Sequence, residues 1–189
     1  MNELENRRSF TTIRLSNLRS LLVEAEARAK DKACVCATGS FGRGEASTHS
    51  DLDLFIVGKD DQVGSNAERN PPRSALRRLD EICVKANLIH ATRELDFPEF
   101  SGDGEYLGHY ALSDLTKTLG KRQDDVTNTF TARLFLLLES CPLVGEAVYE
   151  EVVEEVISVY WRDYEDHRAD FVPAFLTNDI LRLWRTVFV

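Results

Sequence analysis

The amino-acid sequence predicts an α+β fold, in which a small mixed β-sheet with flanking helices precedes an α-helical module. Short apolar runs at residues 33–38 and 51–57 predict strands, and these runs lie between segments with helical periodicity. After about residue 120, only helical periodicity recurs along the chain. These observations predict two domains, residues 1–120 and residues 121–189.

Residues 1–30 are predicted to form the first helix. Their apolar side chains recur at spacings of three and four residues and therefore share one helix face. These side chains are Leu15, Leu18, Leu22, Ala25 and Ala29. A buried strand is predicted next, at 33–38. The segment 39–50 is rich in Gly and Ser, which is typical of a loop or of a loop that opens a short helix.

The strand predicted at 51–57 alternates in character. Successive side chains of a strand point to opposite faces, so even and odd positions separate. One face carries Leu52, Leu54 and Ile56, and the other carries Asp51, Asp53 and Phe55. We therefore expect two carboxylates that point in a common direction.

The rest of the first domain is predicted from weaker patterns. Residues 58–72 are polar and include two prolines, so a loop is expected there. A turn is predicted at 101–104 and a third strand at 106–112, after which Ser113 is expected to cap a short helix. The second helix, which precedes the turn, is marked by Leu76, Leu79, Ile82, Cys83 and Ala86.

The second domain is predicted to consist of helices. Cys141-Pro142 is expected to stop the first of these helices, and Thr177 is a possible cap of the last. The apolar end at Val189 favours a chain that is truncated at its C-terminus. The apolar positions of the three helices are Val126, Phe130, Leu134 and Leu137, then Val148, Val152, Val156 and Tyr160, then Leu176, Ile180, Trp184 and Val187.

Composition limits the classes of function. Lys and Arg number 23 and Asp and Glu 32, which gives a net charge of −9 and disfavours a partner that is a long nucleic acid. Neither a signal peptide nor an apolar run long enough to cross a membrane is visible, so we expect a cytoplasmic protein with no membrane partner. The four cysteines form no C-x-x-C pair, which disfavours a zinc knuckle.

The segment from residue 39 to 57 carries the chemistry. Asp51 and Asp53 present two carboxylates to one point, and such a pair repels itself unless a cation lies between them. Mg²⁺ (or Mn²⁺) prefers oxygen ligands and commonly bridges carboxylates to substrate phosphates. Gly39 allows a backbone to approach a phosphate closely, Ser40 adds a hydroxyl and an N–H, and Arg43 adds a positive fork.

The stretch GSFGRGEASTHSDLDLFIV resembles the signature of the DNA polymerase β-type nucleotidyltransferase superfamily. The G-x-G-R-G-E variant with its Ser-Asp-x-Asp ending is similar in particular to the nucleotidyltransferase domain of the bacterial PII-protein uridylyltransferase and its relatives. The segment TFTARLFLLLESCPLVGE resembles the helical region that follows that domain.

The resemblance implies a nucleotidyltransferase fold and a third carboxylate on a later strand. Glu105 is the first candidate for that carboxylate and Asp103 the second, and Asp96 and Glu99 are further candidates. Catalysis is therefore assigned to Asp51, Asp53 and Glu105, and metal binding to these three and Asp103. Binding of the nucleoside triphosphate is assigned to Gly39, Ser40, Arg43 and Ser50.

The predicted reaction is Mg²⁺-dependent transfer of a nucleoside monophosphate from a triphosphate such as ATP to an acceptor, with release of pyrophosphate. The acceptor stays open among a protein, a small molecule and a nucleotide. The alternative is a catalytically inactive module that binds nucleotide or, like an antitoxin, a protein partner. His49 could contact phosphate or lie in a solvated turn, and His109 could face the site or the core. Arg133 is a candidate for the triphosphate. A solvated helix face is the default for Arg73, Arg77 and Arg78, with a phosphate or acceptor contact as the alternative.

Overall fold

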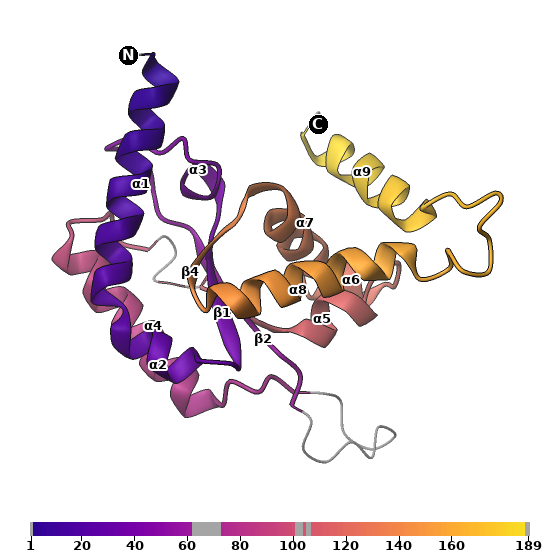
Figure 1. Cartoon of the computed structure of the whole chain (residues 1–189), viewed down its shortest axis with the longest axis horizontal. Helices are drawn as coiled ribbons and strands as arrows, with labels where there is room; N and C mark the ends of the chain where they lie inside the picture. Colours follow the sequence, from indigo (N-terminus) through magenta and orange to yellow (C-terminus); the bar gives the residue numbers. More distant parts are fainter. Residues whose placement is uncertain (1, 62–72, 101–103, 105–106, 188–189) are drawn as a thin grey trace.

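The computed structural model describes residues 2–61, 73–100, 104 and 107–187 (Figure 1). Within these residues the fold is α+β, as predicted, with a four-stranded mixed sheet in the order β3-β2-β1-β4. The central strand β1 pairs antiparallel with β2 and with β4, and β2 pairs parallel with β3. The strands are β1 (Ala33–Ala37), β2 (Leu54–Gly58), β3 (His109–Ala111) and β4 (Cys141–Val144).

Helices cover both faces of the sheet (Figure 1). Alternate residues of the central strands enter two separate cores, since Val35 and Ile56 pack with α1, α2 and α4, whereas Cys36 and Phe55 pack with α5, α7 and α8. The helices are α1 (Glu3–Leu21), α2 (Val23–Ala29), α3 (Gly39–Gly42), α4 (Arg78–Glu94), α5 (Leu112–Lys117), α6 (Gln123–Val126), α7 (Thr129–Glu139), α8 (Glu146–Ser158), the 3-10 turn η2 (Val159–Trp161) and α9 (Ala174–Val187).

The N-terminal elements follow the prediction closely. The apolar stripe of the first helix is buried, although the helix is interrupted at Leu22, where φ is −98° and ψ is 20°. The predicted strand at 51–57 begins only at Leu54, so Asp51 and Asp53 lie in the extended segment that leads into β2. The alternation nevertheless holds, because Leu52 and Leu54 are buried while both acids are exposed.

Two details of the middle of the chain differ from the prediction. In α4 the buried face is Val84, Leu88 and Ala91, while Leu79 and Ile82 are 76% and 52% exposed. The helix begins only at residue 78, so the periodicity read from residue 76 placed the face wrongly. Helix α5 begins at residue 112, and the residue that precedes it, Ala111, is its N-cap. The Ala111 N–H donates to the Asp114 carboxylate at 2.8 Å, so Ser113 is not the cap.

The strand β4 was not predicted. Cys141 and Pro142, which were expected only to stop a helix, begin this strand, and Val144 pairs with Val35 of β1. Proline is tolerated on an edge strand because one side of the strand needs no donor. Residues after position 140 therefore complete the sheet, while the division of the chain near residue 120 stays a prediction.

The last helices also differ in detail. Val126 ends α6 and is 83% exposed, and Asn128 separates α6 from α7 in a left-handed conformation with φ of 56°. In α9, Ile180 and Trp184 are 45% and 59% exposed, since the helix packs through its polar residue Asp179. No helix in the described part of the chain has the length and apolarity that a membrane crossing requires.

Candidate functional site

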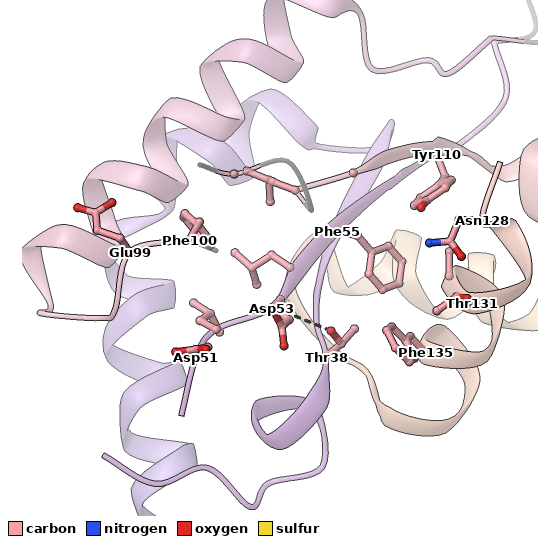
Figure 2. Close-up of a pocket in the computed structure, with 16 residues that line it drawn as sticks. Thr38, Asp51, Asp53, Phe55, Glu99, Phe100, Tyr110, Asn128, Thr131 and Phe135 are labelled. Carbon is pink, nitrogen blue, oxygen red and sulfur yellow. Dashed lines mark hydrogen bonds between the residues drawn. The ribbon is translucent and has the colours of Figure 1, made fainter. Parts of the chain in front are cut away.

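A cavity of about 410 Å³ opens at the end of the two central strands where β1 ends and β2 begins. The segment before β2, the chain before β3 and the first half of α7 form its walls (Figure 2). It is lined by Thr38, Asp51, Leu52, Asp53, Leu54, Phe55, Glu99, Phe100, Gly104, Leu107, Gly108, Tyr110, Asn128, Thr131, Ala132 and Phe135.

The two predicted acids lie together at one end of this cavity. The side chains of Asp51 and Asp53 are neighbours in Figure 2, and both are exposed. The Thr38 N–H donates to the Asp53 carbonyl at 2.9 Å, which ties the acidic segment to the end of β1. Across the described residues, neither carboxylate forms an ion pair with a lysine or an arginine.

The electrostatics of the pair fit a cation. Partial burial, and then the negative charges of Asp51 and Glu139, raise the pKa of Asp53. Two carboxylates that repel each other over an open cavity suit a hard divalent ion, whose ligands are oxygens. In the part of the chain that the structure describes, no group of three or more His, Cys, Asp or Glu side chains gathers that could hold a metal ion.

The turn at Gly39 lies against Asp53. Gly39 has a φ of +62°, and a Cβ built on it would lie 3.4 Å from the Asp53 Oδ2. The first hydrogen bond of α3 runs from the Gly42 N–H to the Thr38 carbonyl at 3.2 Å. The N–H groups of residues 39–41 and the Ser40 hydroxyl form no hydrogen bond with a described residue. These donors are therefore available beside the acids.

None of the four residues predicted to bind nucleotide lines the cavity itself. Gly39 and Ser40 lie in the turn next to Asp53, and Arg43 and Ser50 are held by other contacts. The Arg43 guanidinium pairs with Glu45 at 3.0 Å and also with Glu139 at the end of α7. The Ser50 hydroxyl accepts a hydrogen bond from the Ser47 N–H at 2.9 Å and so shapes the turn before Asp51. Glu139 was not predicted, because only the fold brings it close to the acids.

The end of the cavity away from the two acids is formed by aromatic side chains and by the side-chain amide of Asn128. Phe55 and Tyr110 meet edge to face with their ring centroids 6.2 Å apart, and Phe135, Asn128 and Thr131 of the α7 region lie across from them (Figure 2). Burial, and then the charge of Asp114, raise the pKa of the Tyr110 phenol, which therefore stays neutral. These residues were missed by sequence reasoning, since they come from three separate segments.

The predicted third carboxylate has two main candidates, Glu105 and Asp103, and both lie outside the described residues. Of the two further candidates, Glu99 and Asp96, Glu99 lines the cavity. Its carboxylate accepts a hydrogen bond from the Arg93 Nε at 3.0 Å. Asp96 follows the end of α4 with a φ of 52° and does not line the cavity.

Arg133 is not a triphosphate ligand, which corrects its interpretation as a candidate. Its side chain is fully buried and pairs with Asp124 at 2.8 Å and with Asp179 at 2.9 Å. Tyr160 donates its hydroxyl hydrogen bond to the same Asp179 carboxylate at 2.8 Å. A guanidinium held by two buried carboxylates has no free fork for a phosphate, so Arg133 anchors α9 instead.

Neither candidate histidine lines the cavity. His109 is directed to the opposite face of the sheet from its neighbour Tyr110, where its Nε2 lies 2.8 Å from the Ser74 hydroxyl and its Nδ1 lies 3.0 Å from Glu81. His49 is in the exposed turn before the acids, where its N–H donates to the Ser47 hydroxyl.

Comparison with known proteins agrees with the geometry. Residues 18–100 match the family model described as a nucleotidyltransferase domain. The chain is 29% identical, over 148 residues, to the bifunctional uridylyltransferase/uridylyl-removing enzyme of Zymomonas mobilis subsp. mobilis, and the alignment covers 76% of this chain but 13% of that protein. No solved structure gives a significant match. The resemblance predicted from the sequence is thus confirmed.

Proposed function

We propose that this chain, whose residues 18–100 match a nucleotidyltransferase domain, transfers a nucleoside monophosphate from a nucleoside triphosphate to an acceptor nucleophile. One observation supports this most strongly: Asp51 and Asp53 face an open cavity, next to the turn at Gly39, without a cationic partner among the described residues. UTP is the proposed nucleotide, because the similar protein of Zymomonas mobilis is named a uridylyltransferase.

Each part of the site has a proposed role. Asp51 and Asp53 would hold Mg²⁺ or Mn²⁺, which when bound neutralises phosphate charge and lowers the pKa of a coordinated hydroxyl. The N–H groups of residues 39–41 and the Ser40 hydroxyl would bind the oxygens of the β- and γ-phosphates. Glu105 or Asp103 is proposed as a third carboxylate that accepts the proton of the acceptor.

The reaction balances without a further reagent. The acceptor oxygen forms a bond to the α-phosphorus, the bond from that phosphorus to the bridging oxygen breaks, and pyrophosphate leaves. Phe55 and Phe135 would pack against the nucleobase, and the Asn128 amide offers both a donor and an acceptor to its edge. Arg43 would reach a phosphate only after exchanging Glu139 for it, so we propose a secondary role for Arg43.

The division of labour along the chain is also a proposal. Residues 1–120 would form the catalytic domain, and residues 121–189 the helical domain that closes the nucleobase end through α7. The chain spans 13% of the length of its curated relative, so the acceptor of that larger protein is not carried over. A protein, a small molecule or a nucleotide are the proposed classes of acceptor.

The test uses UTP, CTP, ATP or GTP labelled at the α-phosphate, with Mg²⁺ or Mn²⁺ and a cell extract as the source of acceptor. We expect label from one nucleotide to enter an acceptor, with release of pyrophosphate. Asp51→Asn should abolish the transfer, whereas Asp31→Asn, an equal charge change at an exposed helix end, should not. Undiminished transfer by Asp51→Asn would refute the assignment.

A second candidate function is nucleotide binding without transfer. One observation favours it, namely that the two further carboxylates described near the pair, Glu99 and Glu139, are each engaged by an arginine. Tight Mg²⁺-dependent binding of a triphosphate, with no pyrophosphate released in the presence of any extract, would select this candidate over the transferase.

A further inference from the structure

A second cavity, of about 620 Å³, opens where α4 begins. Its Ser74 lies directly over Gly58 at the end of β2, since a Cβ built on that glycine would lie 1.8 Å from the Ser74 hydroxyl oxygen. Asp53, in contrast, precedes the start of β2. Five residues of extended chain span about 17 Å, so this cavity is separate from the nucleotide cleft. Its lining is Arg73, Ser74, Leu76, Arg77, Arg78, Glu81, Ile82 and Lys85.

The charge of this lining is opposite to that of the whole protein. Four cations and one carboxylate line the cavity, which gives 4 − 1 = +3 in a chain with a net charge of −9. Arg77 pairs with Asp61 at 2.6 Å, and Lys85 pairs with Glu81 at 2.6 Å. Arg73 and Arg78 have no carboxylate partner in the described part of the chain, so two guanidinium charges are uncompensated.

The one carboxylate in the lining is already engaged by the protein. Glu81 accepts hydrogen bonds from Lys85 and from the His109 ring, and although burial raises the pKa of Glu81, these two contacts lower it overall. The His109 ring also holds the Ser74 hydroxyl, which accepts a further hydrogen bond from the Leu76 N–H at 3.1 Å. The polar floor of the cavity is therefore fixed before any ligand arrives.

We propose that this cavity binds a small molecule that carries a diphosphate group, with Arg73 and Arg78 as its principal contacts. A guanidinium donates two parallel hydrogen bonds to phosphate oxygens, and two free guanidiniums match a group with two phosphates. The volume lies within the range of small-molecule sites, about 300–1,000 Å³. Ile82, which is 52% exposed, offers an apolar surface to an organic part of the ligand.

Calorimetric titration with inorganic pyrophosphate in EDTA tests the proposal, because a chelator removes the metal that the nucleotide cleft would need. We expect saturable binding that weakens by about tenfold or more in the double variant Arg73→Gln/Arg78→Gln. The control Arg8→Gln/Lys117→Gln loses the same charge elsewhere on the surface and should change the affinity less than about twofold. Absence of saturable binding, or equal weakening in both double variants, would overturn the proposal.

Two further arms identify the source of the diphosphate and separate this site from the cleft. If the ligand is a nucleotide, UDP should bind more tightly than pyrophosphate, and Ile82→Ala should remove the gain; equal affinities would identify a free diphosphate. Binding in EDTA should persist in Asp51→Asn, whatever the result of the transfer assay. Loss of binding in that variant would place the anion in the cleft and contradict the second site.

Discussion

Asp53 is an exposed carboxylate whose ionisation the folded protein opposes. Its pKa is raised by partial burial and by the charges of Asp51 and Glu139. An ionised carboxylate with a raised pKa and no compensating cation lowers the stability of the fold. Such side chains are characteristic of functional sites. The electrostatics of Asp53 therefore point to the same two acids as the sequence motif.

Asp53→Asn should separate stability from activity. The amide removes the repulsion with Asp51, so we expect unfolding by urea to show a free energy unchanged or raised by less than about 1 kcal/mol, as befits an exposed charge. Transfer should fall by at least about a hundredfold, because a metal ligand is lost. A variant that is both active and unchanged in metal affinity would argue against the role of Asp53.

The raised pKa of Asp53 also sets a pH dependence. Protons compete with the metal for this carboxylate, so affinity for Mn²⁺ should fall as the pH drops through the raised pKa, at a higher pH than for an ordinary aspartate. The free energy of unfolding of the metal-free protein changes in the opposite direction. Because Asp53 loses its proton at a lower pH in the unfolded chain than in the folded protein, the fold loses stability as the pH rises through that range. Mn²⁺ titrations followed by electron paramagnetic resonance would measure the shift, and identical profiles for wild type and Asp53→Asn would contradict it.

At this scale the sequence predicted the acids and the glycine turn, because both are set by neighbouring residues. The spacing of Asp51 and Asp53 determines their common direction, and Gly39 has the positive φ that its residue type allows. Glu139 and Asn128 were not predicted, since they reach the site only through the packing of α7. The role of Arg43 depends equally on that packing.

Among the elements, the short helix α3 depends on close contact with the end of α7. A Cβ built on Gly42 would lie 1.9 Å from the Glu139 carbonyl oxygen, and 2.9 Å from that of Ala37. These are backbone atoms, which cannot move aside as a flexible side chain can. Gly42 therefore fixes the position of the turn that we propose to bind phosphate.

Gly42→Ala should displace this turn. We expect a loss of about 1–3 kcal/mol in the free energy of unfolding, as for overpacked sites, together with weaker nucleotide binding. The matched variant Gly44→Ala introduces only the strain of a positive φ, since the nearest atom is 3.9 Å away, and should leave binding nearly intact. Equal binding by both variants would show that α3 does not position the nucleotide.

Helix α9 is held by a buried charge cluster rather than by its apolar face. Asp179 and Arg133 are fully buried and bonded to each other, and Arg182 extends the cluster to Asp124. Sequence periodicity predicted the helix but not its orientation, because it assumed that Ile180 and Trp184 face inward. Buried ion pairs are seldom visible in a sequence, since burial of the partners depends on several elements.

Asp179→Ala should detach this helix. Removing one partner of a buried ion pair costs about 3–5 kcal/mol, and we expect the lower end because Asp124 still holds Arg133. The exposed neighbour Asn178→Ala serves as the control, and the measurement is urea unfolding followed by circular dichroism. A loss no larger than that of the control would mean that the cluster does not anchor α9.

At the scale of the whole molecule, one sheet joins distant parts of the sequence. The α+β class was predicted correctly because strand and helix periodicities are local, whereas β4 was missed because its four residues follow an apolar helix and contain a proline. The acids lie at one end of β2 and the basic cavity at the other, so the strand separates the proposed cation site from the proposed anion site. The proposed nucleotide would thus be held mainly by a bound metal and by the backbone N–H groups of α3, with Arg43 in a secondary role.

Calorimetry with UTP decides whether Asp51 and Asp53 bind nucleotide through a metal. We expect saturable binding with Mg²⁺, at least about tenfold weaker binding in EDTA, and the same loss in Asp51→Asn with Mg²⁺ present. Because the cavity at α4 also takes anions in our proposal, the titration is performed in the Arg73→Gln/Arg78→Gln background. Equal UTP affinity in that background with Mg²⁺, with EDTA and with Asp51→Asn would mean that the two acids do not bind the nucleotide through a metal.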